Sequence, residues 1–222
     1  IAVADGMGGH AGGEVASKVA ITTLAQILPL LNNDKMDPES LEDFLMGSLI
    51  DIDHDIRQTV LDDDRLSGMG TTLTAIALYR DRAYVLHAGD SRAYRLRGKE
   101  LQQITKDHSV VQELIDSGAI TEAEAAFHPQ RSVLTNVLMG QGNITPLLVS
   151  YEVKPGDKFL LCSDGLNTVV SNDEIHAALK GEGAISKLVE LTYERGAPDN
   201  VTIILAEVSQ SDTETQFIGA AK

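Results

Sequence analysis

Three aspartates stand where apolar, strand-like runs of the chain end, each beside a residue that favours a turn. The three pairs are Asp5-Gly6, Asp164-Gly165 and Asp199-Asn200. Glycine lets the backbone turn sharply and allows a ligand to approach its carbonyl group. Carboxylates, backbone carbonyls and water are the ligands that Mg²⁺ and Mn²⁺ prefer. The pattern predicts a metal site assembled from distant segments.

Each of these segments alone has a simpler explanation, since aspartate before glycine is common in turns. The first segment, residues 5–10, has a glycine-rich sequence, so a nucleotide-binding loop is an alternative. It lacks the Gly-Lys-Ser/Thr ending of a P-loop and fits the dinucleotide fingerprint poorly. The recurrence of carboxylates at strand ends therefore favours the metal site.

Five short motifs occur in a fixed order along the chain. They are Asp5-Gly6-Met7-Gly8-Gly9-His10, Gly70-Thr71-Thr72, Gly89-Asp90-Ser91-Arg92, Ser163-Asp164-Gly165-Leu166 and Asp199-Asn200-Val201-Thr202. Together they resemble the bacterial metal-dependent protein serine/threonine phosphatases of the PPM, or protein phosphatase 2C, family. The resemblance covers residues 1–208, which we expect to form a single phosphatase domain followed by a polar tail at 209–222.

The resemblance implies an α+β fold, a four-layer α-β-β-α sandwich with two mostly antiparallel central sheets. It also implies two Mg²⁺ or Mn²⁺ ions, with a possible third. Asp5 would bridge the two core ions, the Gly6 carbonyl would bind one, and Asp164 and Asp199 would bind the other. Asp90, with Asp164, and Ser132 correspond to residues near the third ion. A helical insertion at about 107–138 would form the flap that shapes substrate access.

By the same resemblance, the activity is hydrolysis of phosphoserine and phosphothreonine in proteins, opposing serine/threonine kinases. His10 is the candidate general acid, because a histidine pKa lies near neutrality. The alternative for His10 is a surface histidine on a glycine loop. The family's upstream strand, with an Arg and an Asn-Glu-Asp run, has no counterpart, so the chain is expected to be a fragment lacking this strand. A catalytically weak phosphoprotein-binding module is the alternative function.

The elements that position these residues can be predicted from apolar spacing. Residues 16–31 and 41–60 show helical periodicity and predict two amphipathic helices. Residues 72–98 predict a meander of consecutive antiparallel strands, and later strands are expected at 147–153, 158–163 and 201–208. In the flap, Asp107 is expected to cap a helix, and Thr121 to open a capping box with Glu124.

Two further helices follow the strand at 158–163. Ser171 opens another capping box before a helix that ends at Gly181, and a last helix spans about 185–194. Because strands are grouped together with helices before and after them, an α+β fold is expected.

The formal net charge of −15 argues against nucleic acid or an anionic membrane as the main partner. The acidic run at 51–55 is expected to lie on a solvated helix face. The single cysteine, Cys162, is expected in the core of a protein from a reducing compartment, and no apolar run reaches the length of a membrane span. We therefore expect a cytoplasmic, monomeric protein whose partners are phosphoproteins and a kinase.

Overall fold

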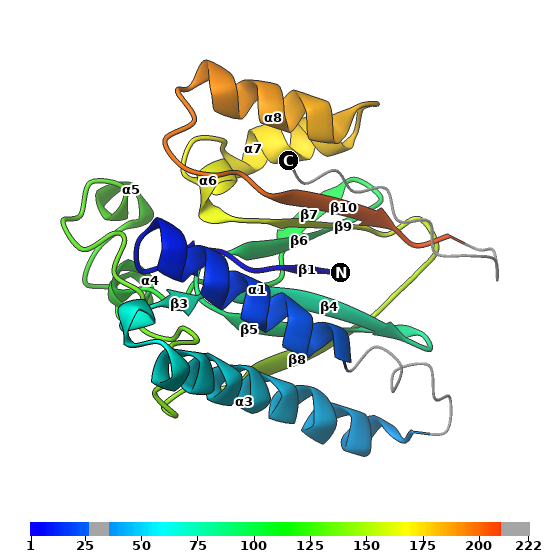
Figure 1. Ribbon diagram of the computed structural model, residues 1–222. Coiled ribbons are helices and arrows are strands. Elements are labelled where there is room, and N and C mark those ends of the chain that lie inside the picture. Colours follow the sequence, from blue (N-terminus) through cyan, green and yellow to red (C-terminus); the bar gives the residue numbers. More distant parts are fainter. Residues whose placement is uncertain (27–35, 210–222) are drawn as a thin grey trace.

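The computed structural model describes residues 1–26 and 36–209, which form four layers (Figure 1). One sheet has the strand order β1-β4-β5-β8 and the other β10-β9-β6-β7. Their strands are β1 (Ala2–Val3), β4 (Leu73–Tyr79), β5 (Arg82–Ala88), β6 (Arg92–Arg97), β7 (Glu100–Gln103), β8 (Leu147–Glu152), β9 (Lys158–Cys162) and β10 (Ile203–Glu207). All of the pairings are antiparallel. A short pair, β2 (Gly6–Met7) with β3 (Gly70–Thr71), lies beside them.

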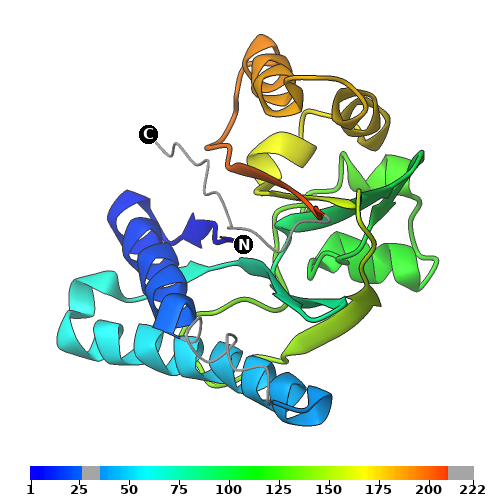
Figure 2. The same ribbon diagram turned by 90° about the vertical axis from the view of Figure 1, so that its right-hand side faces the viewer.

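Helices cover both outer faces of this pair of sheets, so the predicted α-β-β-α sandwich is confirmed (Figure 2). On one side lie α1 (His10–Gln26) and α3 (Pro38–Asp62), followed by the short turn η1 (Asp64–Leu66). On the other side lie α6 (Asp164–Asn167), α7 (Asn172–Leu179) and α8 (Ala184–Glu194). None of the helices within the described ranges is both long and apolar enough to cross a membrane.

Alternation along the strands divides the buried side chains among three apolar clusters. On β9, Phe159 and Leu161 face the other sheet, whereas Leu160 and Cys162 face α6, α7 and α8. On β5, Val85 faces the middle cluster. A strand with apolar residues on both faces is expected when it is covered on both sides. The prediction that Cys162 is a core residue is confirmed, because its side chain is fully buried.

The expected meander at 72–98 is wrong at its centre. Strands β4 and β5 form a hairpin, but β5 and β6 belong to different sheets. The chain therefore crosses from one sheet to the other at residues 89–91. Strand β7 pairs with β6 and was not predicted.

Three local predictions in the helices have mixed outcomes. The capping boxes at Thr121 and Ser171 are both present. Asp107 is not a cap: α4 (Val110–Asp116) is capped by Ser109, and Asp107 pairs with Arg92 instead. The last five residues of the first predicted helix, 27–31, and the tail beyond Ser209 lie outside the described residues.

Candidate metal centre

The predicted aspartates gather at one end of the sandwich, where β1 and β9 end and the chain crosses between sheets (Figure 1). Asp5 follows β1, Asp90 lies in the crossing, and Asp164 begins α6 directly after β9. Asp199 lies in the segment before β10. The flap helices α4 and α5 (Glu122–Ala125) are at the same end (Figure 1).

A network of threonine and serine hydroxyls holds Asp5 beside the crossing. The Asp5 backbone N–H donates to Thr72 Oγ1 at 3.0 Å, and the Thr72 N–H donates to the Asp5 carbonyl at 2.8 Å. The Thr71 hydroxyl donates to the same carbonyl at 2.9 Å. Thr72 Oγ1 also lies 2.8 Å from Ser91 Oγ, directly after Asp90. The network therefore fixes Asp5 relative to Asp90 through the backbone.

Ser163 joins the other two aspartate-bearing segments. Its hydroxyl donates to the Asn200 carbonyl at 3.2 Å and accepts from the Thr202 N–H at 3.0 Å. Asp164 and Asp199 are the neighbours of Ser163 and Asn200 in sequence. The turn after β9 and the segment before β10 are consequently held together.

Gly165 is required by this close contact. A Cβ at this position would lie 2.2 Å from the Asn200 carbonyl oxygen, which is far inside van der Waals contact. Any side chain would push the segment carrying Asp199 away from Asp164. The glycine that follows Asp164 therefore allows the close spacing of two carboxylates.

The carboxylates are close enough to raise one another's pKa. The pKa of Asp5 is raised to about 7 by burial and by the nearby charges of Asp164, Asp199 and Asp90, with a hydrogen bond to Asp164. The pKa of Asp164 is also raised, mainly by burial and by the charge of Asp199, although the hydrogen bond from Asp5 opposes this. Without a cation, burial and the neighbouring charges favour a proton on Asp5, which donates to Asp164.

Asp107 is a member of this cluster that the sequence did not reveal. Burial raises the pKa of Asp90 to about 6, and the charges of Asp164 and Asp107 add to it. Asp107 receives three hydrogen bonds from Arg92, from Nε to Oδ1 at 2.9 Å and to Oδ2 at 3.1 Å, and from Nη2 to Oδ2 at 2.7 Å. In the sequence Asp107 stands at the start of the flap, where its position predicts a helix cap and gives no sign of a carboxylate near Asp90.

The residues fit a divalent cation that keeps part of its water shell. Asp164 Oδ1 is one of two buried side-chain polar atoms in the described ranges that lack a hydrogen-bond partner. Mutually repelling carboxylates and an unpartnered oxygen both favour an added positive charge. In the ranges that the structure describes, no three His, Cys, Asp or Glu side chains are already spaced to hold an ion directly. Mg²⁺ retains several waters and needs only one or two direct carboxylates.

The other three predicted site residues are Gly6, His10 and Ser132. Gly6 lies in β2 with its carbonyl against Gly13 of α1, where a Cβ on Gly13 would lie 2.6 Å from that oxygen. His10 begins α1, and its side chain is outside the described part of the structure. Ser132 is exposed on the flap, and no hydrogen bond joins its side chain to the aspartates in the described ranges. The structure brings together Asp5, Asp90, Asp164 and Asp199, but not Ser132.

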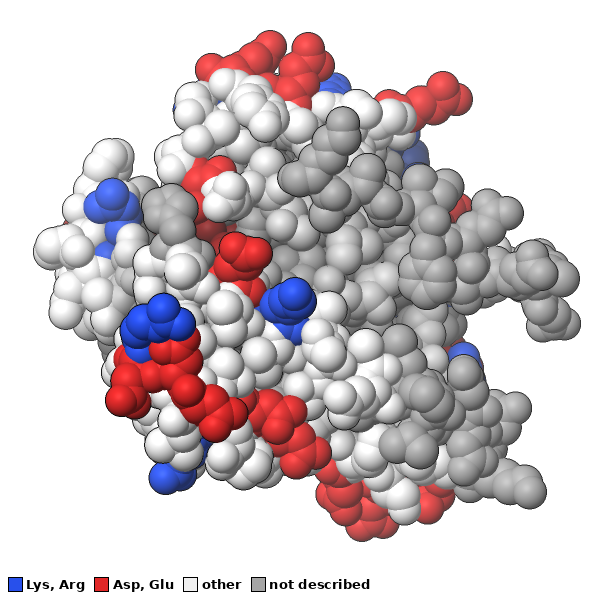
Figure 3. All heavy atoms as spheres, in the orientation of Figure 1, with Lys and Arg blue, Asp and Glu red and all other residues white. Residues whose placement is uncertain are grey.

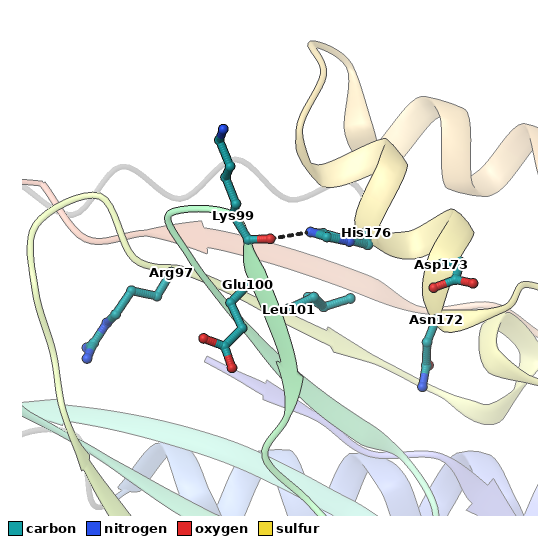
Figure 4. A pocket seen from close by; sticks show the side chains of 7 residues that line it. All are labelled: Arg97, Lys99, Glu100, Leu101, Asn172, Asp173 and His176. Carbon is teal, nitrogen blue, oxygen red and sulfur yellow. Dashed lines mark hydrogen bonds between the residues drawn. The ribbon is translucent and has the colours of Figure 1, made fainter.

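A surface hollow lies elsewhere on the molecule. It has a volume of about 540 Å³ and is lined by residues of β6, β7, the turn between them and α7 (Figure 4). The His176 Nε2 atom lies 2.8 Å from the Lys99 carbonyl there. This hollow is at the Arg97 end of β6, away from the aspartates. The hollow is separate from the candidate metal centre, which is a surface cluster of carboxylates beside the flap.

A two-sheet sandwich with strand-end aspartates gathered at one edge defines a class of metal-dependent protein domain. Comparison with known proteins identifies its family. A family model described as protein phosphatase 2C matches residues 1–202. The chain belongs to the protein phosphatase 2C family.

Named relatives in bacteria support this assignment. The chain is 44% identical over 216 residues to the serine/threonine protein phosphatase PstP of Mycobacterium tuberculosis, covering 96% of this chain and 41% of PstP. It is 34% identical to the protein phosphatase PhpP of Streptococcus pneumoniae, covering 96% of this chain and 87% of PhpP. The chain thus spans less than half the length of PstP.

Solved structures give the same family. The crystal structure of the M. tuberculosis phosphatase has a TM-score of 0.86 and 43% identity, covering 94% of this chain and 88% of that chain. A catalytic domain of PstP in complex with two manganese ions has a TM-score of 0.83 and 41% identity, covering 94% and 87%.

Proposed function

We propose that this protein hydrolyses phosphoserine and phosphothreonine in proteins in a reaction that requires Mg²⁺ or Mn²⁺. The observation that carries the proposal is the cluster of Asp5, Asp90 and Asp164, whose pKa values are raised by burial and mutual repulsion, with Asp164 Oδ1 unpartnered. Membership of a phosphatase family and the manganese bound by a relative support the choice of reaction. Nothing observed favours a binding module without turnover.

In this proposal each aspartate has a separate role. Asp5, the Gly6 carbonyl, Asp164 and Asp199 would hold the two core ions. Asp90 and Asp164 would hold an additional ion, and Ser132 on the flap is a further candidate ligand for it. When bound, a pair of divalent cations acidifies a water molecule and offsets charge on the phosphoryl oxygens. The Thr72 and Ser163 networks keep the carboxylates oriented while the ions bind.

His10 donates a proton to the leaving serine or threonine oxygen. Its place at the start of α1, five residues after Asp5, puts it on the segment that carries the candidate bridging carboxylate. A general acid of this kind contributes a factor of about 10²–10⁴ to the rate.

The proposed partners are phosphorylated proteins and a serine/threonine kinase, and the proposed state is a cytoplasmic monomer. Acidic side chains gather along the edge of the molecule formed by α3 (Figure 3). Such a surface repels phosphate-rich polymers. Size-exclusion chromatography with light scattering tests the monomer.

The experiment that tests the function is hydrolysis of a small aryl phosphate and a phosphothreonine peptide with Mn²⁺. We expect both substrates to be cleaved, and an excess of chelator to abolish cleavage. Restoration by Mn²⁺ after the chelator controls for damage to the protein. Hydrolysis that continues unchanged in the chelator would contradict the metal-dependent mechanism.

The role of His10 is tested by comparing leaving groups. An alkoxide needs a proton much more than an aryl oxide does. We expect His10→Ala to lower kcat by about a hundredfold or more on the phosphothreonine peptide, and much less on the aryl phosphate. Equal losses on both substrates would show that His10 does not act as the general acid.

A further inference from the structure

Asp53 is a buried carboxylate in the middle of α3. Its exposed fraction is 3%, although it lies in the acidic run 51–55 that was expected to face water. That prediction is wrong for Asp53. The adjacent positions in this run, Ile52 and His54, are buried and exposed respectively. A charged side chain in such a position needs partners that replace water.

Three backbone N–H groups provide those partners. Asp53 Oδ1 accepts from the N–H groups of Met139 at 3.0 Å and Gly140 at 2.7 Å, and Oδ2 accepts from the Gly142 N–H at 2.8 Å. These residues follow the flap, so the carboxylate fastens the segment by which the flap returns to the sheets.

The returning segment lies directly on α3. Gly140 has φ of 73°, and a Cβ there would lie 2.6 Å from the Arg57 backbone nitrogen. A side chain at this position would separate the segment from the helix. Asp53 and Gly140 therefore fix the distance between the segment and α3.

The same segment reaches the candidate metal centre through Leu138. Leu138 pairs with Thr71, with N–H to carbonyl distances of 2.9 and 3.1 Å. The Thr71 hydroxyl in turn donates to the Asp5 carbonyl. A continuous series of hydrogen bonds and neighbouring residues joins Asp53 to Asp5.

We propose that Asp53 is a positioning residue for the metal centre, acting on Asp5 through the segment 138–142 and Thr71. This inference rests on the proposed function, because it takes Asp5 to be a metal ligand. Asp53 does not touch the ions or the substrate. Its effect is to hold the backbone of Asp5 in the orientation that lets the carboxylate bind.

The central variant is Asp53→Asn, which keeps the shape of the side chain. The remaining side-chain oxygen still accepts from the segment. The new NH₂ group is a donor that faces a backbone N–H donor, so a hydrogen bond is lost there. The matched control is Asp51→Asn, the same chemical change on an exposed residue of the same helix. Thr71→Val removes the hydroxyl that bonds to Asp5, and Thr71→Ser retains it.

Mn²⁺ affinity is measured from the electron paramagnetic resonance signal of free Mn²⁺, and kcat and KM on the aryl phosphate are measured separately. We expect Asp53→Asn and Thr71→Val each to weaken Mn²⁺ binding about tenfold, as loss of groups behind metal ligands does. Asp51→Asn and Thr71→Ser should resemble the wild type. At saturating Mn²⁺ the KM of Asp53→Asn should return to the wild-type value.

The double variant Asp53→Asn with Thr71→Val decides whether the two residues act along one connection. The combined loss of Mn²⁺ affinity should be smaller than the product of the single losses. Thermal unfolding in chelator shows which variants are folded, and Thr71→Val extends the test should Asp53→Asn not fold.

Two results overturn the proposal. If folded Asp53→Asn binds Mn²⁺ as Asp51→Asn does, Asp53 has only a structural role, and the proposed function is untouched. If the wild type itself neither binds Mn²⁺ nor hydrolyses the aryl phosphate, the proposed function fails and this inference fails with it.

Discussion

Strand β9 has an aspartate at each end, and the two carboxylates differ in their hydrogen-bond partners and in the direction of their pKa shifts. Asp157, before the strand, is 1% exposed and is held by Arg97 Nε at 2.8 Å, Arg97 Nη2 at 2.6 Å and the Lys154 N–H at 2.8 Å. Burial alone would raise its pKa, but Arg97 and the Lys154 N–H lower it below the usual value. Asp164, after the strand, has a raised pKa and an unpartnered oxygen.

The difference separates carboxylates that serve the fold from those available for chemistry. Asp157 and Asp53 accept hydrogen bonds from donors that the fold places against them, so their negative charge is balanced in the folded state. Asp5 and Asp164 face each other, and their charge is relieved only by a proton or a cation. Burial alone does not distinguish the two kinds of site, whereas the identity of the partners does.

The largest expected effect is the loss of activity when Asp164, the aspartate after β9, is replaced. Asp164→Asn should lower Mn²⁺-dependent hydrolysis by about a thousandfold, because a proposed metal ligand and its charge are lost. The melting temperature in chelator should stay the same or rise, since a repelling charge is removed. Steady-state kinetics and calorimetry measure the two quantities, and a fully active Asp164→Asn would remove Asp164 from the metal centre.

The second effect is on stability when metal is added. Mn²⁺ at about a hundred times its dissociation constant should stabilise the wild type by about 2.7 kcal/mol, because it binds only the folded state. Asp157→Asn should gain the same increment, whereas Asp164→Asn should gain little. Chemical denaturation with and without Mn²⁺ measures the increments. Equal increments in all three proteins would place the ions elsewhere.

A third effect is the loss of stability when Asp157, the aspartate before β9, is replaced. Asp157→Asn should lower the free energy of unfolding by about 2 kcal/mol, less than for a fully buried pair because Arg97 is partly exposed to water. Activity of the folded fraction should remain within about twofold of the wild type. Urea denaturation and the aryl phosphate assay test this. A large loss of activity in folded Asp157→Asn would end the contrast between the two strand ends.

The smallest effect is on pH dependence without metal. The unfolded pKa of aspartate is about 3.9, and in the folded state it is about 7 for Asp5 and about 6 for Asp90. The folded state therefore binds more protons between these values, and its stability falls as the pH rises from about 4 to about 7. Since the carboxylates are partly exposed, the expected loss is about 1 kcal/mol.

Asp164→Asn provides the control for this pH effect. It removes a charge that raises both pKa values, so its stability should fall less steeply over the same range. Asp157 contributes in the opposite direction, because its stabilisation is lost only as the pH falls through its lowered pKa. Urea denaturation in chelator at about pH 5 and about pH 7.5 measures the slopes. A steeper slope in Asp164→Asn than in the wild type would contradict the electrostatic account.

Local sequence patterns were sufficient for the strands that carry Asp5 and Asp164 and for both capping boxes. Each of these depends on residues within a few positions of one another. The crossing at 89–91 was not predictable in the same way, because a turn between two apolar strands looks the same whether they pair or separate into different sheets. The Gly89-Asp90-Ser91 sequence indicated only a turn.

The roles of Asp107 and Asp53 depend on partners that are distant in sequence. Asp107 pairs with Arg92 across the base of the flap, and Asp53 bonds to a segment more than eighty residues later. In the sequence Asp53 belongs to the acidic run 51–55, which suggests an exposed helix face. Only the folded chain reveals that a backbone segment covers it.

The apolar cluster between the two sheets has a consequence for the metal centre. Val3 and Leu161 belong to this cluster, and they precede Asp5 and Asp164 by two and three residues. The gap between the two carboxylates is therefore set by the thickness of hydrocarbon between the sheets. Replacing Leu161 by a smaller side chain would change the distance between the two carboxylates from inside the molecule, without altering any polar atom at its edge.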